Sequence, residues 1–203
     1  MKRRLIIFGL GDIAEVAAYL FMQHTDYELV AFCVDKEYLT ASRFMDKPVV
    51  DFQDITRDYP PHSYDLFVAI GYRNLNKERE NKYAQAKALG YKLATYVSPH
   101  ATVFDNVAIG DNCFIFENNV IQPFVQIGNN TVLWSGNHVG HHTVIGNHCF
   151  IASHAVISGR VTIKNNVFIG VNATLRDHIT VGEYCVVGAG AVLLKDAEKD
   201  QVF

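Results

Sequence analysis

The stretch Ile145-Gly-Asn-His-Cys-Phe-Ile151-Ala-Ser-His-Ala-Val-Ile157-Ser-Gly-Arg-Val-Thr-Ile163 decides the fold, because an aliphatic residue returns at every sixth position. The same spacing holds at seventeen consecutive positions, from Val97 to Leu193. Pairs such as Asn129-Asn130 and Asn165-Asn166 stand between the aliphatics and suit tight or left-handed turns. A six-residue repeat of this kind predicts a parallel β-helix, with three repeats in each coil and all seventeen aliphatics pointing inward and buried.

The cysteines fit the same register. Cys113, Cys149 and Cys185 are spaced by two coils each, so we expect them to be stacked on one face of the β-helix. Strands of neighbouring coils lie about 4.8 Å apart, and two coils therefore separate these residues by about 9.6 Å. A disulfide requires Cα atoms within about 7 Å. The spacing thus predicts reduced core cysteines, as is usual in the cytoplasm.

Residues 1–96 follow a different pattern, in which apolar strands alternate with helices. Strands are expected at Leu5–Phe8, Leu29–Val34, Asp65–Ile70 and Tyr91–Tyr96, and helices at Ile13–Met22 and Asn74–Leu89. Residues 36–61 are predicted to hold a loop, a short strand near Val49 and a short helix. This alternation favours a parallel sheet. We therefore expect an α/β Rossmann-like domain over residues 1–96 and an all-β parallel β-helix over residues 97–203.

Composition narrows the class of protein. The chain has 203 residues, of which 49% are hydrophobic and 19% charged, and this balance is typical of a soluble globular protein. A net charge of −3 gives no reason to expect nucleic acid or a membrane surface as partner. No apolar run reaches the roughly 18 residues of a membrane span. The expected compartment is the cytoplasm.

Histidines cluster where the repeat does not need them. Five of the nine lie between His138 and His154. Val139 and Thr143 take the inward positions, so His141 and His142 are expected on a turn, facing outward. Histidine titrates near neutral pH and serves as proton acceptor or metal ligand.

Several motifs, taken together, resemble a known family over essentially the whole chain. They are Phe8-Gly9-Leu10-Gly11, Val34-Asp35-Lys36, Phe67–Gly71, Gly140–Gly146, Phe168–Asn172 and Gly188–Val192. The hexapeptide repeat resembles the left-handed β-helix acyltransferases. The domain in front of it narrows the resemblance to the family of the sialic acid O-acetyltransferase NeuD and the nucleotide-amino-sugar N-acetyltransferase PglD.

This resemblance implies an acetyl-CoA-dependent transfer to an amino or hydroxyl group of a nucleotide-linked sugar, in the synthesis of surface glycan precursors. It makes His141 the general base and places His142 where the family usually has an acid. The implied acetyl-CoA contacts are Phe150, Gly170, Val171 and Ala189. The implied nucleotide-sugar contacts are Gly9, Leu10, Gly11, Asp12, Asp35, Lys36 and Gly71. The resemblance also implies a homotrimer with active sites between neighbouring β-helices, and no metal.

The residues themselves fit acyl transfer. A thioester donor requires a base for the attacking amine or hydroxyl, together with N–H donors for the oxyanion. His141 offers the base. The backbone N–H groups of Gly140 and of Gly159, one coil away, offer the donors.

Four other interpretations compete with this one. The first is sialic acid O-acetylation. The second is a zinc enzyme of the β-helix carbonic anhydrase type, with His142, His178 and Glu183 as ligands. The third is a dinucleotide oxidoreductase, since Gly9–Ala14 approximates the binding fingerprint and Asp35 stands where a ribose-binding acid would, although a second mononucleotide half is missing. The fourth is a catalytically inactive structural β-helix.

Overall fold

A computed structural model describes residues 3–203, which form two compact units. The first unit comprises the residues up to Gly71 together with Asn81–Ala94. The second comprises Tyr72–Glu80 and Thr95–Phe203. A short segment from the first half of the chain, Tyr72–Glu80, therefore belongs to the second unit.

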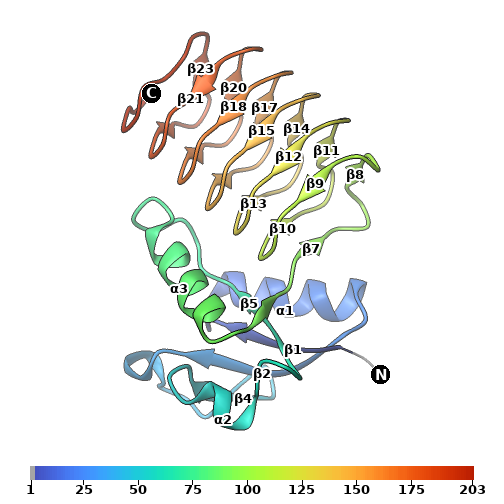
Figure 1. The fold of residues 1–203 in the computed structure, drawn as a ribbon, viewed down its shortest axis with the longest axis vertical. Coiled ribbons are helices and arrows are strands. Elements are labelled where there is room, and N and C mark those ends of the chain that lie inside the picture. The colour runs from blue at the N-terminus through green and yellow to red at the C-terminus, as the bar shows by residue number, and fades with distance from the viewer. Residues whose placement is uncertain (1–2) are drawn as a thin grey trace. The chain divides into compact units, whose positions relative to one another are not determined.

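The first unit is built on a six-stranded sheet in the order β3-β4-β2-β1-β5-β6 (Figure 1). All neighbouring strands are parallel except β3 and β4, which pair antiparallel. The strands are β1 (Arg3–Phe8), β2 (Tyr27–Val34), β3 (Arg43–Phe44), β4 (Lys47–Asp51), β5 (Asp65–Val68) and β6 (Lys92–Leu93). The helices are α1 (Asp12–His24), α2 (Ile55–Asp58) and α3 (Lys77–Ala88), with a 3-10 turn at Lys36–Tyr38.

Apolar spacing explains how these elements pack. Residues 5–8 of β1 are buried on both faces, as expected of a central parallel strand. Helix α1 buries Ala14, Ala17, Ala18 and Phe21, which share one helical face. The helix ends where the Thr25 hydroxyl donates to the carbonyl oxygen of Phe21.

Two predicted elements of this region differ from those observed. The helix expected from Asn74 begins only at Lys77, because Asn74, Leu75 and Asn76 adopt left-handed φ angles of 51°, 47° and 65°. The strand expected at 91–96 is split in two. Its first part, β6, pairs with β5, whereas β7 (Tyr96–Val97) pairs with β10 (Phe114–Ile115) of the β-helix.

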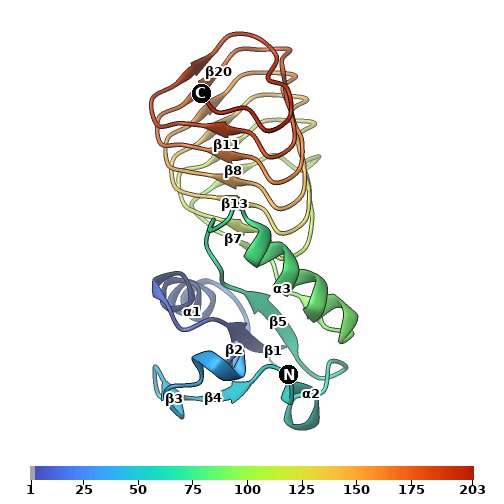
Figure 2. The same cartoon turned by 90° about the vertical axis from the view of Figure 1, so that its left-hand side faces the viewer.

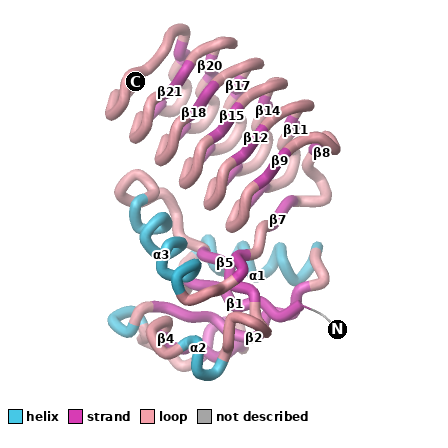
Figure 3. Tube along the Cα trace, viewed as in Figure 1, coloured by secondary structure: helices cyan, strands magenta, loops and turns pink. Residues whose placement is uncertain are grey.

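The β-helix contains seventeen two-residue strands joined by turns (Figure 3). They are β7 (Tyr96–Val97), β8 (Thr102–Val103), β9 (Ala108–Ile109), β10 (Phe114–Ile115), β11 (Val120–Ile121), β12 (Gln126–Ile127), β13 (Val132–Leu133), β14 (His138–Val139), β15 (Val144–Ile145), β16 (Phe150–Ile151), β17 (Val156–Ile157), β18 (Thr162–Ile163), β19 (Phe168–Ile169), β20 (Thr174–Leu175), β21 (Thr180–Val181), β22 (Val186–Val187) and β23 (Val192–Leu193).

Three parallel sheets form the faces of the β-helix. We call them face A (β7, β10, β13, β16, β19, β22), face B (β8, β11, β14, β17, β20, β23) and face C (β9, β12, β15, β18, β21). The edges AB, BC and CA are the turns that lead from one face to the next. Figure 2 shows the coils of the β-helix stacked one above the next.

The six-residue pattern places the core correctly. The second residue of every strand is one of the seventeen aliphatics, and fourteen of them are buried. The expectation that all seventeen are buried is wrong for Val97, Val103 and Ile109, which are half-buried because they lie in the first coil, with a coil on one side only. The three stacked cysteines are buried and free, as predicted.

The turns obey the same period. A left-handed residue recurs at every sixth position from Asn112 to Gly190. Asparagine and glycine at many of these positions tolerate that conformation. The regular turns hold the side chains of each edge in line, one coil above the next.

Candidate active site

The two candidate catalytic histidines lie on edge BC, in the turn between β14 and β15. Val139 and Thr143 on either side are fully buried, and both histidines are exposed, as the repeat predicts. His142 occupies the left-handed position of its turn, with φ of 60°. This backbone conformation directs the two side chains out of the coil at neighbouring positions.

The two imidazole rings contact each other directly. Nδ1 of His141 lies 3.1 Å from Nδ1 of His142, so one hydrogen is shared between them. The His142 ring also packs on Phe124, one coil earlier, with ring centroids 4.6 Å apart. The Gln122 side chain accepts a hydrogen bond of 2.9 Å from the backbone N–H of His141. Both histidines are therefore oriented by the preceding coil.

The shared hydrogen fixes what each ring can do. If His141 donates its Nδ1–H to His142, its Nε2 carries a lone pair and can accept a proton. His142 must then be neutral to act as acceptor. Desolvation, followed by the positive charges of Arg160 and His141, lowers the pKa of His142. The environment thus favours the neutral form of His142.

Gly159 lies against the His141 ring. A Cβ added to Gly159 would lie 2.8 Å from Nε2 of His141, so only glycine leaves room for the ring in this position. Among residues 3–203, no acceptor contacts the backbone N–H of Gly159. This N–H is a donor suited to a developing oxyanion.

Gly140 has a different role from the one predicted. Its N–H donates to the carbonyl oxygen of Ile157 at 2.7 Å and is therefore not available as an oxyanion donor. A Cβ on Gly140 would lie 2.5 Å from the backbone nitrogen of Gly159, so Gly140 allows two successive turns to approach closely. The expectation of two glycine donors is corrected to one.

The predicted acetyl-CoA contacts lie elsewhere on the β-helix. Gly170, Val171 and Ala189 belong to edge AB, in successive coils, and a Cβ on Gly170 would lie 2.5 Å from the nitrogen of Ala189. Face B separates them from the histidines. Phe150 lies on face A and is 5% exposed. The structure therefore does not bring these four residues together with His141 in one chain.

Phe150 is covered by the segment Tyr72–Glu80. The ring of Tyr72 packs on Phe150 and on Phe168, each with a centroid distance of 4.9 Å. Buried Arg79 donates to the carbonyl oxygens of His148 at 3.2 Å and Cys149 at 3.0 Å. Desolvation lowers the pKa of Arg79 to about 10. These contacts anchor the segment, and the ring of Phe150 is buried beneath it.

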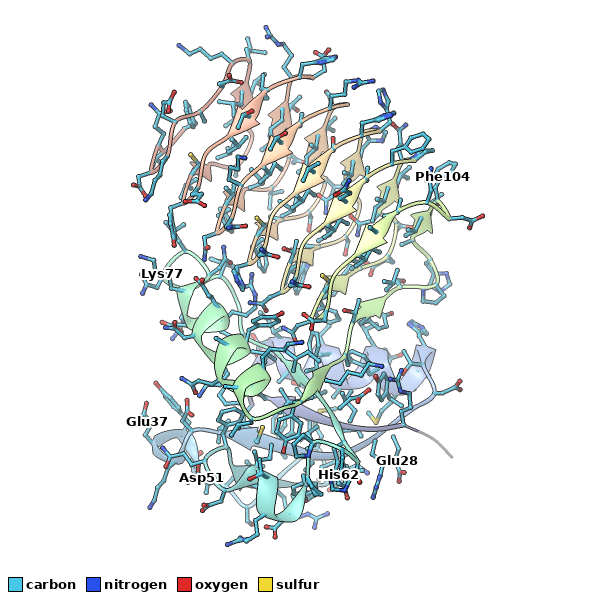
Figure 4. The ribbon with its side chains drawn as sticks, viewed as in Figure 1. Glu28, Glu37, Asp51, His62, Lys77 and Phe104 are labelled. Atoms are coloured by element: carbon cyan, nitrogen blue, oxygen red, sulfur yellow. The ribbon has the colours of Figure 1, made fainter. Side chains whose placement is uncertain are left out.

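Two further contacts of this segment lie along edge CA. Glu80 accepts a hydrogen bond of 2.8 Å from Asn166. Lys77, labelled at the start of α3 in Figure 4, places its ammonium 5.0 Å from the centroid of the Tyr184 ring. Aromatic packing, hydrogen bonds and a cation–π contact thus hold this segment against the β-helix.

The predicted nucleotide-sugar contacts of the first unit follow three neighbouring strands. Gly9–Asp12 follow β1, Asp35 and Lys36 follow β2, and Gly71 follows β5. Because these strands are parallel, their carboxyl ends meet at one edge, where ligands of open α/β sheets bind. Gly9 has φ of 123°, and a Cβ there would lie 2.9 Å from the carbonyl oxygen of Ala69. The structure therefore brings all these predicted contacts to one edge.

Helix α1 begins at this edge without a side-chain cap. Its N-cap residue is Gly11, around which an added Cβ would meet nothing within 4 Å. The first backbone N–H groups of a helix attract anions such as phosphate.

Sequence reasoning missed several residues of these sites. Gln122 and Phe124 stand about one coil before His141 and His142, so counting back by one coil would have found them. Lys82 on α3 forms an ion pair with Asp35, 47 positions away, and no local pattern points to it.

The part of the chain that the structure describes holds neither a metal-ligand cluster nor a membrane-spanning helix. No group of three or more metal-ligating side chains comes together within residues 3–203, so His142, His178 and Glu183 do not form a ligand set there. None of the helices described is long and apolar enough to span a membrane.

Comparison with known proteins identifies the class. Residues 106–137, 124–159 and 160–195 match the bacterial transferase hexapeptide (six repeats) family. The acetyltransferase domain of PglB from Neisseria gonorrhoeae FA1090 is 28% identical, with a TM-score of 0.87 over 98% of this chain and 95% of that chain. No curated protein matches the chain.

Two more solved structures share the fold. PerB from Caulobacter crescentus, in complex with CoA and GDP-perosamine, is 24% identical, with a TM-score of 0.85 over 98% of this chain and 92% of that chain. WeeI from Acinetobacter baumannii AYE is 20% identical, with a TM-score of 0.83 over 98% of this chain and 95% of that chain. The chain is a hexapeptide-repeat acyltransferase. Its hexapeptide repeats and its similarity to the PglB acetyltransferase domain confirm the resemblance to PglD/NeuD-type enzymes drawn from its motifs.

Proposed function

We propose that the protein transfers the acetyl group of acetyl-CoA to an amino or hydroxyl group of a nucleotide-linked sugar. The observation that carries this proposal is the His141–His142 pair beside the backbone N–H of Gly159, which has no acceptor among residues 3–203. The PglB domain has been solved in complex with acetyl-CoA, and PerB with CoA and GDP-perosamine. These complexes support acetyl-CoA as co-substrate and a nucleotide-linked sugar as acceptor.

The reaction follows from the geometry of edge BC. The acceptor nitrogen or oxygen attacks the thioester carbonyl carbon while Nε2 of His141 takes its proton. The backbone N–H of Gly159 donates to the oxyanion that forms on the carbonyl oxygen. The tetrahedral intermediate then collapses, and the C–S bond breaks. The CoA thiolate leaves and takes a proton from His141 or from water.

His142 replaces the acid that usually follows the base in this family. A carboxylate would stabilise the imidazolium by charge, whereas neutral His142 offers only a hydrogen-bond acceptor. The proposed role of His142 is to accept the Nδ1–H of His141 and so keep the lone pair on Nε2.

The acceptor's nucleotide is assigned to the sheet edge of the first unit. The glycine turn after β1, the open start of α1 and Asp35 offer backbone N–H groups for phosphates and a carboxylate for the nucleoside. Sialic acid O-acetylation is the alternative within the same family. It requires an acceptor with a carboxylate and without a diphosphate.

A homotrimer is part of the proposal. Face B exposes Val120, Val156 and Val192, which are 37%, 40% and 63% exposed. Packing of neighbouring chains along this face would cover these side chains and bring edge AB of one chain to edge BC of the next. The predicted acetyl-CoA contacts and the histidines would then share one site. Free buried thiols fit a reducing compartment, so the proposed location is the cytoplasm.

The decisive experiment is a substrate screen. The purified protein is mixed with acetyl-CoA and UDP-, GDP- or CMP-linked amino sugars, or with free sialic acid, while thiol release and product mass are recorded. We expect acetylation of a nucleotide-linked sugar and loss of most activity in His141→Ala. Acetylation of sialic acid alone would favour the alternative, and no acetylation of any acceptor would contradict the proposal.

A further inference from the structure

A buried lysine stands behind one of the predicted nucleotide contacts. The side chain of Lys82, on α3, is only 8% exposed. Its Nζ lies 2.6 Å from Oδ1 of Asp35 and 2.7 Å from Oε1 of Gln85. It also lies 4.8 Å and 4.4 Å from the ring centroids of Phe8 and Phe52. Two oxygens and two aromatic faces thus surround one ammonium group.

Such burial requires compensation, because an ammonium withdrawn from water is unfavourable unless it is paired and hydrogen-bonded. Asp35 supplies the opposite charge and Gln85 a second acceptor. Phe8 and Phe52, which pack edge to face at 5.3 Å, offer cation–π contacts. The position of Nζ is therefore fixed from several sides, and it fixes Asp35 in turn.

Asp35 is the exposed member of the pair. Its side chain is 33% exposed, and the contact with Lys82 uses Oδ1. Within residues 3–203 no donor contacts Oδ2. Asp35 directly follows β2, at the edge where the chain also turns at Gly9 and Gly71. Oδ2 is available to accept a hydrogen bond from a ligand at that edge.

Charge gives Lys82 a second effect. A nucleoside diphosphate carries negative charge, and an unpaired carboxylate beside it would repel it. The Glu37 carboxylate nearby is exposed to solvent (Figure 4), where water screens it. The buried ammonium of Lys82 makes the Asp35 pair neutral overall.

We propose that Lys82 is a positioning residue of the acceptor nucleotide site. It holds the Asp35 carboxylate so that Oδ2 accepts a hydrogen bond from the nucleoside, and it cancels the charge that would face the diphosphate. The inference rests on the proposed function for the class of ligand, a nucleoside diphosphate.

The first test is Lys82→Met, which keeps an unbranched side chain between Phe8 and Phe52 and removes the charge. Calorimetric titrations use UDP, GDP and acetyl-CoA as probes. We expect the Kd of the tighter nucleotide to rise about ten-fold, equivalent to one charge-assisted hydrogen bond, while the Kd of acetyl-CoA is unchanged. Lys92→Met, at an exposed lysine of β6, is the matched control and should bind both as the unmodified protein does.

A rescue variant separates positioning from general damage. In Lys82→Met/Asp35→Asn, the unpaired carboxylate becomes a neutral amide that still carries an acceptor oxygen. We expect its Kd to rise by clearly less than the product of the two single effects. Additive losses would mean a merely structural role. Lys82→Gln, which keeps a donor for Asp35, is measured as well in case Lys82→Met does not fold, and should show an intermediate Kd.

The outcomes separate this inference from the proposed function. Unchanged nucleotide affinity in both Lys82 variants, an equal loss of acetyl-CoA affinity, or no nucleotide binding by the unmodified protein would each overturn the inference. Lys82-dependent nucleotide binding without any acetyl transfer would leave the inference standing and refute the proposed function. Acetyl transfer with Lys82-independent nucleotide binding would do the reverse.

Discussion

Gly159→Ala tests whether the position of the His141 ring sets the rate. The φ angle of Gly159 lies outside the left-handed region, so alanine brings no backbone strain. The three atoms nearest to the added Cβ all belong to His141, namely Nε2 at 2.8 Å, Cε1 at 2.9 Å and Cδ2 at 3.3 Å. Ordinary contact begins at 3.4 Å, so the ring must move by at least the difference between 3.4 and 2.8, about 0.6 Å.

This displacement gives the expected size of the effect. A misplacement of about 1 Å lowers the rate about a hundred-fold, so about 0.6 Å should lower kcat between about ten-fold and a hundred-fold. Because the His141 side chain is exposed, it can move aside without displacing core residues, and the free energy of unfolding should change by less than about 0.5 kcal/mol. Thiol release at saturating acetyl-CoA and acceptor measures kcat, and urea denaturation measures stability.

The double variant His141→Ala/Gly159→Ala tests whether Gly159→Ala lowers kcat by displacing the His141 ring. In the His141→Ala background, Gly159→Ala should lower kcat no further, because the ring that it displaces is gone. Ser158→Ala, one residue earlier, is the control and should leave kcat unchanged. An unchanged kcat in Gly159→Ala, or the same reduction in both backgrounds, would refute the reasoning.

Three other predictions concern the base, the acceptor and the core. His142→Ala should lower kcat clearly less than His141→Ala. His142→Glu should stay active with the acidic limb of kcat/KM at higher pH, because a carboxylate stabilises a neighbouring imidazolium by charge and a neutral imidazole does not; an unshifted limb would contradict this. Asp35→Ala should raise the KM of the acceptor but not that of acetyl-CoA, and the opposite result would exchange the roles of the two units. In urea denaturation, buried Ile145→Ala should lose about 2–5 kcal/mol, and its outward neighbour Val144→Ala, 38% exposed on face C, about 0.5 kcal/mol or less; equal losses would contradict the register.

The sequence predicts the β-helix far better than the site built on it. A strict six-residue period determines which residue of each strand faces inward. Each coil pairs only with its neighbours, and a shift of the strand register by one residue would expose the core side chains. The left-handed turns predicted at Asn130 and Asn166 are observed, with φ of 56° and 58°. The exposed position of His141 and His142 also follows directly from the period.

Features that depend on contacts distant in sequence were not predictable. The packing of Tyr72 on the ring of Phe150, for example, has no sign in the sequence around Phe150. Gly140 was predicted to be an oxyanion donor, because the sequence does not show that its N–H donates to the carbonyl oxygen of Ile157. Lys82 lies on a helix whose polar face gave no sign of a buried ion pair with Asp35. In each case the partner comes from another coil or element.

The measurement that tests the central claim most directly is the kcat of His141→Ala in acetyl transfer, with the Kd of acetyl-CoA measured on the same variant. The proposed mechanism predicts a kcat lower by about a hundred-fold or more, since a general base is lost, and an unchanged Kd. A His141→Ala variant that transfers acetyl near the unmodified rate, while His142→Ala is inactive, would contradict the assignment of the base.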